Sequence, residues 1–197
     1  MTEEHPGTAV DTPDSAPSMP SELEQVLAAV RARIPGIVAE IDATPPEGGL
    51  VVERDDLLEV CKLLKEDSSL QFKLPLFSTA IDWLDREPRF DLVYQLRSLK
   101  RGTTIRLKVG VSDSPTESAW VPSVTGIWVG MGWQEREVFD LFGIDFRDHP
   151  DLRRLLMPID WEGHPLRKDY VSFGEPVKFS DRESFAPDSA VPRGAPD

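Results

Sequence analysis

Two early segments, 22–34 and 55–66, carry apolar side chains at the spacing of one helical face. Pro35 and Gly36 follow the first segment directly and can end it. Short β-type runs at 37–41 and 50–52 flank a turn rich in proline and glycine. The first third of the chain therefore predicts two amphipathic helices with two short strands between them.

Three longer segments predict strands, at 76–84, 90–98 and 103–111. The second and third alternate apolar and polar positions, and Arg101-Gly102 between them suits a tight hairpin, so antiparallel pairing follows. The expected fold is α+β: a largely antiparallel sheet with helices packed on one face, plus an irregular extended C-terminal tail.

A further helix is predicted over 133–142, with Gly143 able to end it. Its polar arc holds Trp133, Arg136, Glu137 and Asp140. Glu135 falls instead in the apolar arc, where an isolated charge is costly, so we expect it to be buried and bound either by a cation or by several hydrogen-bond donors. Glu135 and Glu137 have two interpretations, an acid–base pair or two structural anchors, and the second is favoured because structural ion pairs perturb carboxylates as readily as active sites do.

Two nearby arginines can supply the cation. We predict a short helix over 152–157, capped by Asp151, that carries Arg153 and Arg154 on a side different from its leucines. Either of the two arginines could reach Glu135.

Composition narrows the class of protein. The chain has 197 residues, 40% of them hydrophobic, which suits one globular domain. Its 22 basic and 35 acidic residues give a net charge of −13, which makes nucleic acid an unfavourable partner. No apolar run approaches the roughly 20 residues of a membrane-spanning helix and no secretory signal is present, so we expect the chain in the cytosol.

The expected organisation has four parts. Residues 1–20 and 180–197 are proline-rich and poor in large apolar side chains, which predicts two disordered tails. Residues 21–157 form the α+β domain, and 158–179 form an extended partner-binding segment.

Cofactor chemistry has little support in the sequence. The single cysteine, Cys61, cannot form an internal disulfide or hold an iron–sulfur cluster or zinc alone, and its helical spacing favours a buried, inert thiol. No phosphate loop or dinucleotide fingerprint is present. We therefore expect no cofactor in this chain.

Two histidines leave a metal site open as an alternative. His149 and His164, with oxygen ligands from Asp148, Asp151 and Glu162, could serve a stand-alone metal-dependent hydrolase. Each histidine precedes a proline, which favours extended backbone at a turn. Turn histidines bonded to nearby backbone are therefore the favoured interpretation.

Residues 158–170 predict neither helix nor strand, yet carry large anchors such as Trp161 and Tyr170. Long irregular segments with aromatic residues are usually functional. The segment either lies on another protein or folds back over its own sheet, and the sequence does not decide between these.

The run EREVFDLFGIDFRDHPDLRRLLMPIDWEGHPLRKDY closely resembles the motif of the complex I 30 kDa subunit family, the C subunits of bacterial NADH:quinone oxidoreductase. Two positions depart from the usual pattern, Ile159, where an acid is common, and Val171, where proline is usual. The residues taken as family motif or interface are Glu135, Arg136, Glu137, Asp140, His149, Arg153, Arg154, Trp161, His164, Leu166, Arg167, Lys168, Asp169 and Tyr170.

The resemblance implies a redox-silent subunit in the peripheral arm of respiratory complex I, on the cytoplasmic side of the inner membrane. It implies no catalytic, cofactor-binding or metal-binding residues in this chain, with FMN and iron–sulfur clusters in partner subunits. The implied partners are the D and B subunits near the quinone site. Subunits of ferredoxin- and hydrogenase-linked membrane oxidoreductases share parts of the motif, so an equivalent role in such a complex is the alternative.

Overall fold

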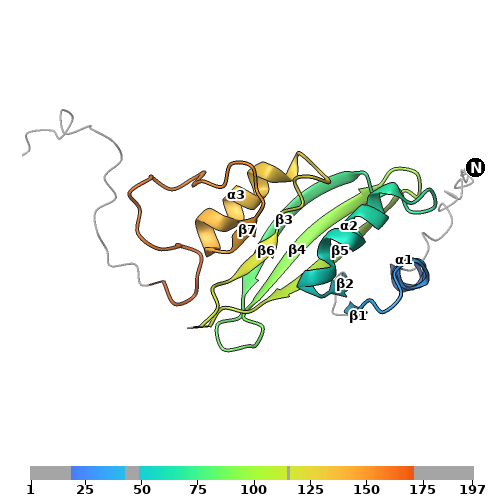
Figure 1. Ribbon diagram of the computed structural model, residues 1–197, viewed down its shortest axis with the longest axis horizontal. Helices are drawn as coiled ribbons and strands as arrows, with labels where there is room; N and C mark the ends of the chain where they lie inside the picture. Colours follow the sequence, from blue (N-terminus) through green and yellow to red (C-terminus); the bar gives the residue numbers. More distant parts are fainter. Residues whose placement is uncertain (1–18, 43–48, 115, 171–197) are drawn as a thin grey trace, which may run out of the picture.

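The computed structural model describes residues 19–42, 49–114 and 116–170 (Figure 1). A 3-10 turn at Arg54–Asp56 precedes the second helix. The helices and strands are α1 (Met19–Arg33), β1 (Ala39–Asp42), β2 (Gly49–Val52), α2 (Leu57–Glu66), β3 (Leu74–Asp82), β4 (Phe90–Ser98), β5 (Thr103–Val111), β6 (Trp120–Pro122), α3 (Met131–Phe142) and β7 (Asp145–Arg147).

One five-stranded sheet, in the order β1-β2-β5-β4-β3, carries the fold. Strands β3, β4 and β5 form an antiparallel meander in which Leu92 lies opposite both Ala80 and Val109. The pairing of β2 with β5 is parallel, which the long connection through α2 and two further strands allows. The predicted α+β class with a largely antiparallel sheet is confirmed. The small parallel sheet of β6 and β7 is a feature that the sequence pattern did not predict.

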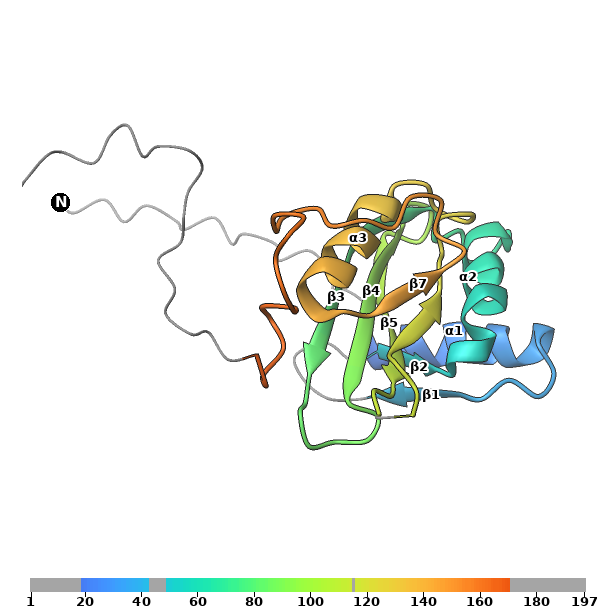
Figure 2. The ribbon, with the colours of Figure 1, turned by 60° about the vertical axis from the view of Figure 1, so that its left-hand side comes forward.

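The core lies on one face of the sheet. Alternate residues of β4, including Leu92, Tyr94 and Leu96, are fully buried there. Buried side chains of α1, α2 and α3 join them in a single cluster, as expected for helices packed on one face. Figure 2 shows α1 and α2 next to each other beside the sheet. Val93 is also buried but faces the other way and lies outside this cluster.

Two local expectations have different outcomes. Gly143 ends α3 with φ of 74°, a left-handed conformation that glycine adopts easily, as predicted. The helix predicted over 152–157 is wrong, since those residues form bends and irregular backbone. The expected arms at 1–20 and 180–197 lie almost wholly outside the described residues, as does 171–179 of the expected partner-binding segment.

Within the described ranges, no helix has the length and apolar character required to span a bilayer.

Candidate functional site

Glu135 is fully buried, as its position in the apolar arc of α3 predicted. Burial raises the pKa of this carboxyl to about 7, against the opposing effect of two hydrogen bonds. Those bonds come from the Ser123 hydroxyl at 2.6 Å and the Val124 N–H at 2.8 Å. Of the two arrangements that the sequence allowed, several donors and not an arginine are observed: neutral groups from the loop after β6 hold Glu135.

The two arginines proposed for that role are bound elsewhere. Arg153 is largely exposed and pairs with Asp151 at 2.9 Å. Arg154 pairs with Asp140 at 2.7 Å. Because its pKa is raised to about 7 and two neutral donors hold it, Glu135 does not need a cation, and both arginines make other contacts.

Two further buried titratable groups interact electrostatically with Glu135. Cys61 of α2 and Tyr94 of β4 are both fully buried. Burial, and secondarily the charge of Glu135, raises the pKa of each well above its ordinary value. Cys61 is therefore a protonated core thiol, in agreement with the expectation of an inert residue.

Asp140 was expected on the exposed arc of α3, and this expectation is wrong, because the side chain is fully buried. Its Oδ2 accepts three consecutive backbone N–H groups, of Leu155, Leu156 and Met157, at 2.7–2.9 Å. Burial alone would raise the pKa of Asp140, but these bonds and the Arg154 guanidinium lower it below its ordinary value. The chain turns around this oxygen instead of forming the predicted helix.

Arg136 was also expected on the exposed arc and is instead buried. Its guanidinium donates to the carbonyls of Arg153 and Arg154, both at 3.0 Å, and lies 4.9 Å from the Trp133 ring. Arg154 in turn donates to the carbonyls of Trp161 and Gly163, at 2.9 and 3.0 Å. Two guanidiniums therefore fasten the irregular segment 153–163 to α3.

Both histidines bind backbone, which agrees with the turn interpretation. His149 donates from Nε2 to the Gly132 carbonyl at 3.0 Å, while its Nδ1 accepts the Asp151 N–H. His164 donates from Nδ1 to the Asp140 carbonyl at 2.9 Å. Among the described residues, no three His, Cys, Asp or Glu side chains are grouped to hold a metal ion. The donor geometry therefore does not support the hydrolase alternative.

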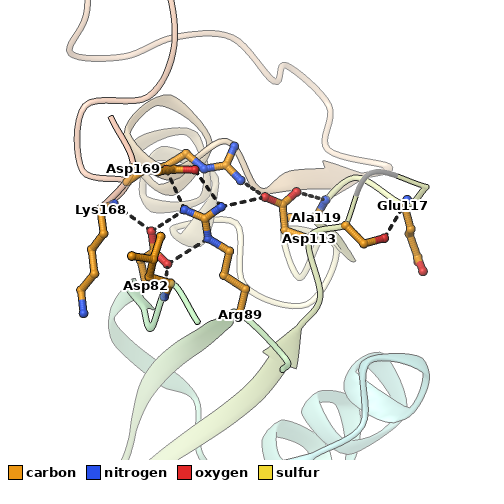
Figure 3. Close-up of polar contacts among 10 residues, drawn as sticks. Asp82, Arg89, Asp113, Glu117, Ala119, Lys168 and Asp169 are labelled. Atoms are coloured by element: carbon orange, nitrogen blue, oxygen red, sulfur yellow. Dashed lines mark hydrogen bonds and ion pairs between the residues drawn. The ribbon is translucent and has the colours of Figure 1, made fainter. Parts of the chain in front are cut away.

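An electrostatic cluster that the sequence did not reveal holds the end of the described chain (Figure 3). Arg89 binds both carboxylate oxygens of Asp82, at 3.0 and 2.8 Å, and both of Asp169, at 3.1 and 2.7 Å. Arg167 pairs with Asp113, and Asp82 accepts the Lys168 N–H at 2.9 Å. We call Asp82, Arg89, Asp113, Arg167 and Asp169 the Arg89 cluster.

Two carboxylates of the Arg89 cluster, Asp82 and Asp169, are held in the charged form. Hydrogen bonding to Arg89 lowers the pKa of Asp82 and of Asp169 below their ordinary values. Asp82 and Arg89 lie at the two ends of the β3–β4 turn, so only the strand register brings them together. No short sequence motif marks such a pair.

Residues 158–170 fold back over their own domain. The Leu166 N–H donates to the Leu141 carbonyl at 3.0 Å, and Tyr170 packs against Gly163. Of the two arrangements that the sequence left open, this is the one observed for the described part of the segment. Figure 1 shows the segment running beside α3.

Large apolar side chains are exposed on the outer side of this assembly, among charged ones. We call four of these apolar side chains, each 52–95% exposed, the α3–tail surface: Trp133, Leu156, Ile159 and Leu166. Glu137 of α3 is exposed as well, as expected. A buried polar frame under exposed apolar side chains is typical of a protein–protein contact surface.

Comparison with known families agrees with the motif. The model of the respiratory-chain NADH dehydrogenase 30 kDa subunit matches residues 50–176. The chain belongs to this family.

Individual relatives support the assignment. The C subunit of the NADH-quinone oxidoreductase of Roseiflexus sp. (strain RS-1) is 41% identical over 155 residues, which cover 79% of this chain and 87% of the relative. The C subunit of the Geobacter sulfurreducens enzyme is 44% identical over 137 residues, or 69% and 78% of the two chains. A chain from the structure of the membrane-bound sulfane sulfur reductase, an archaeal respiratory membrane complex, superposes with a TM-score of 0.63 at 25% identity, covering 77% of this chain and 86% of that one.

Proposed function

We propose that this chain is a redox-silent scaffold subunit in the peripheral arm of an NADH:quinone oxidoreductase, on the cytoplasmic side of the membrane. In this role it takes part in no electron transfer itself. FMN and iron–sulfur clusters belong to other subunits, and the chain docks on the D-type and B-type subunits near the quinone site. Family membership and the relatives named as C subunits of this oxidoreductase support the proposal.

The α3–tail surface is the observation that carries the proposal. Asp140 fixes the backbone of Leu156, and the Leu166 N–H binds the Leu141 carbonyl. Arg136 and Arg154 hold the carbonyls of Arg153 and Trp161 in the same segment. A surface that is ordered before binding loses less conformational entropy on association, so more of its apolar contact energy contributes to affinity. The motif residues thus act indirectly, by shaping a surface for another protein.

The same contacts support a role without chemistry. The carboxylates of Glu135 and Asp140 are both fully buried and are fully engaged by neighbouring donors. A catalytic acid or base must reach a substrate, and these groups face the interior of the domain. Their function in this account is to hold α3 and the segment that follows it.

A second candidate is the equivalent subunit of a related membrane oxidoreductase with another electron donor or acceptor. The similarity to a chain of the sulfane sulfur reductase complex favours this candidate. In this candidate the α3–tail surface would dock on the subunits of that other complex.

Native isolation of the tagged chain from membranes tests the proposal. We expect D-type and B-type subunits, an FMN-bearing subunit and NADH:quinone activity to accompany it. The separately purified chain should show no flavin or iron–sulfur absorption. Isolation with a ferredoxin- or sulfur-linked complex would favour the second candidate, and a chain that binds no other subunit would contradict both.

A further inference from the structure

The edge strand β3 and the turn after it expose a second apolar surface. Strand registers place Leu74 opposite Arg97, Phe77 opposite Gln95 and Ile81 opposite Asp91. These positions lie on the sheet face opposite the core. Six large apolar side chains of this stretch, each 40–44% exposed, form a surface that we call the β3 strip: Leu74, Leu76, Phe77, Ile81, Trp83 and Leu84.

The backbone of the β3 strip is arranged so that these side chains point outward. An irregularity in the register between Pro75 and Phe77 keeps both Leu74 and Phe77 on the open face, where strict alternation would have put one of them in the core. Leu84 has φ of 59°, a conformation that leucine rarely adopts, and Asp82 holds it by accepting its N–H at 2.8 Å. Contiguous apolar side chains with such support mark an interaction surface more often than a free one.

We propose that the β3 strip is a docking surface for another subunit of the same membrane complex, one that presents apolar side chains bordered by carboxylates. This inference rests on the proposed function and extends the contact area beyond the motif. The strip is continuous with the α3–tail assembly at both ends. Gln134 of α3 donates to the Leu76 carbonyl at 3.4 Å, and Lys168 lies 5.9 Å from the Trp83 ring.

Charge selects the kind of occupant. Lys73 and Arg97 are exposed at the Leu74 end of the strip, and none of the ion pairs between described residues involves either of them. They are therefore available to carboxylates of a partner. A second copy of this chain, with its own net charge of −13, would be repelled at long range, and so would an anionic lipid surface. A carboxylate-bordered subunit meets both the apolar and the charged part of the surface.

Site-specific photo-crosslinking in the assembled complex tests this inference. A photoreactive phenylalanine analogue replaces Phe77 in the full chain, and the same analogue at Leu99 is the control, because Leu99 is 73% exposed in the β4–β5 turn outside the strip. We expect the probe at Phe77 to attach to one defined subunit of the purified complex and the probe at Leu99 to give at least tenfold less of that product. A product with a second copy, a product with lipid, or no product above the control would each overturn the proposal.

Introduction of a negative charge supplies a second readout. Phe77→Glu should reduce incorporation of the chain into the complex by more than tenfold, whereas Leu99→Glu should leave it unchanged, with both purified variants unfolding at wild-type temperature. Equal incorporation of the two variants would overturn the docking surface. If the wild-type chain enters a complex and only the Phe77 results fail, this inference fails while the proposed function stands; a wild-type chain without partners removes the proposed function itself.

Discussion

Asp140 of α3 and Arg154, fourteen residues further along, form an ion pair of 2.7 Å in which the carboxylate is fully buried. The same carboxylate accepts the N–H groups of Leu155, Leu156 and Met157. One side chain therefore replaces the hydrogen bonds that a regular element would have given this stretch. The α3–tail surface depends on this arrangement, because Leu156 belongs to the stretch that Asp140 holds.

Asp140→Ala should destabilise the domain by about 3–5 kcal/mol, since it leaves the partly buried Arg154 and three N–H groups without their acceptor. Hydrogen exchange should accelerate across residues 153–163. Asp145→Ala, at an exposed carboxylate just beyond the same helix, is the matched control and should change stability little. Similar small effects for both variants in denaturant unfolding would contradict the role assigned to Asp140.

Glu135 should make stability depend on pH in a defined direction. Its pKa is about 7 in the folded chain against an ordinary value of 4.5, so the folded state holds the proton more tightly. The stabilisation is complete below about pH 4.5 and is lost as pH rises through 7, for a total of about 3 kcal/mol.

The comparison with Glu135→Gln isolates this effect, because Asp82, Asp140 and Asp169, with lowered pKa values, act in the opposite direction at acid pH. Urea unfolding of both proteins from pH 5 to 8 gives the measurement. The stability of the wild type should fall relative to that of the glutamine variant as pH rises. A constant difference would show that Glu135 keeps an ordinary pKa.

Arg89→Ala should release the end of the described chain, since Arg89 is the common partner of Asp82 and Asp169. The Lys168 amide, bound to Asp82, should exchange at least tenfold faster. Arg86→Ala is the control, because Arg86 lies in the same turn but pairs with Asp91 at the surface. Unchanged protection of the Lys168 amide in Arg89→Ala would show that other contacts hold the segment.

Gly143→Ala tests the packing of the segment against α3. A Cβ at this position would come within 2.4 Å of the His164 ring, and φ is 74°. We expect a loss of roughly 1–3 kcal/mol and displacement of His164 from the Asp140 carbonyl. Gly126→Ala, where a Cβ meets nothing within 4 Å, should be close to neutral in the same thermal unfolding experiment.

The strands were the most predictable part of the fold. The observed bounds of β4 and β5, Phe90–Ser98 and Thr103–Val111, match the alternating runs residue for residue, because alternate residues of each strand face the core. Glu135 was placed correctly for a similar reason: periodicity shows which side of a helix faces the core.

The polar frame was less predictable. Periodicity placed Asp140 and Arg136 on the exposed arc, and it could not show that residues 153–163 return to cover that arc. Asp82 and Arg89 meet only because β3 and β4 pair in one register, which their own sequences do not specify. Hydrogen bonds between segments far apart in the chain are the part of the site that required the structure.

The central claim is that the α3–tail surface docks the chain onto the subunits near the quinone site. The most direct measurement is the amount of D-type and B-type subunits isolated from membranes with a tagged chain that carries Trp133→Ser and Ile159→Ser, two exposed positions of that surface. The tagged wild type and a Val38→Ser variant are the references. The account predicts that only the double variant loses both subunits and NADH:quinone activity, by at least tenfold. Unfolding of the free double variant should be unchanged. Full recovery of both subunits with the double variant would contradict it.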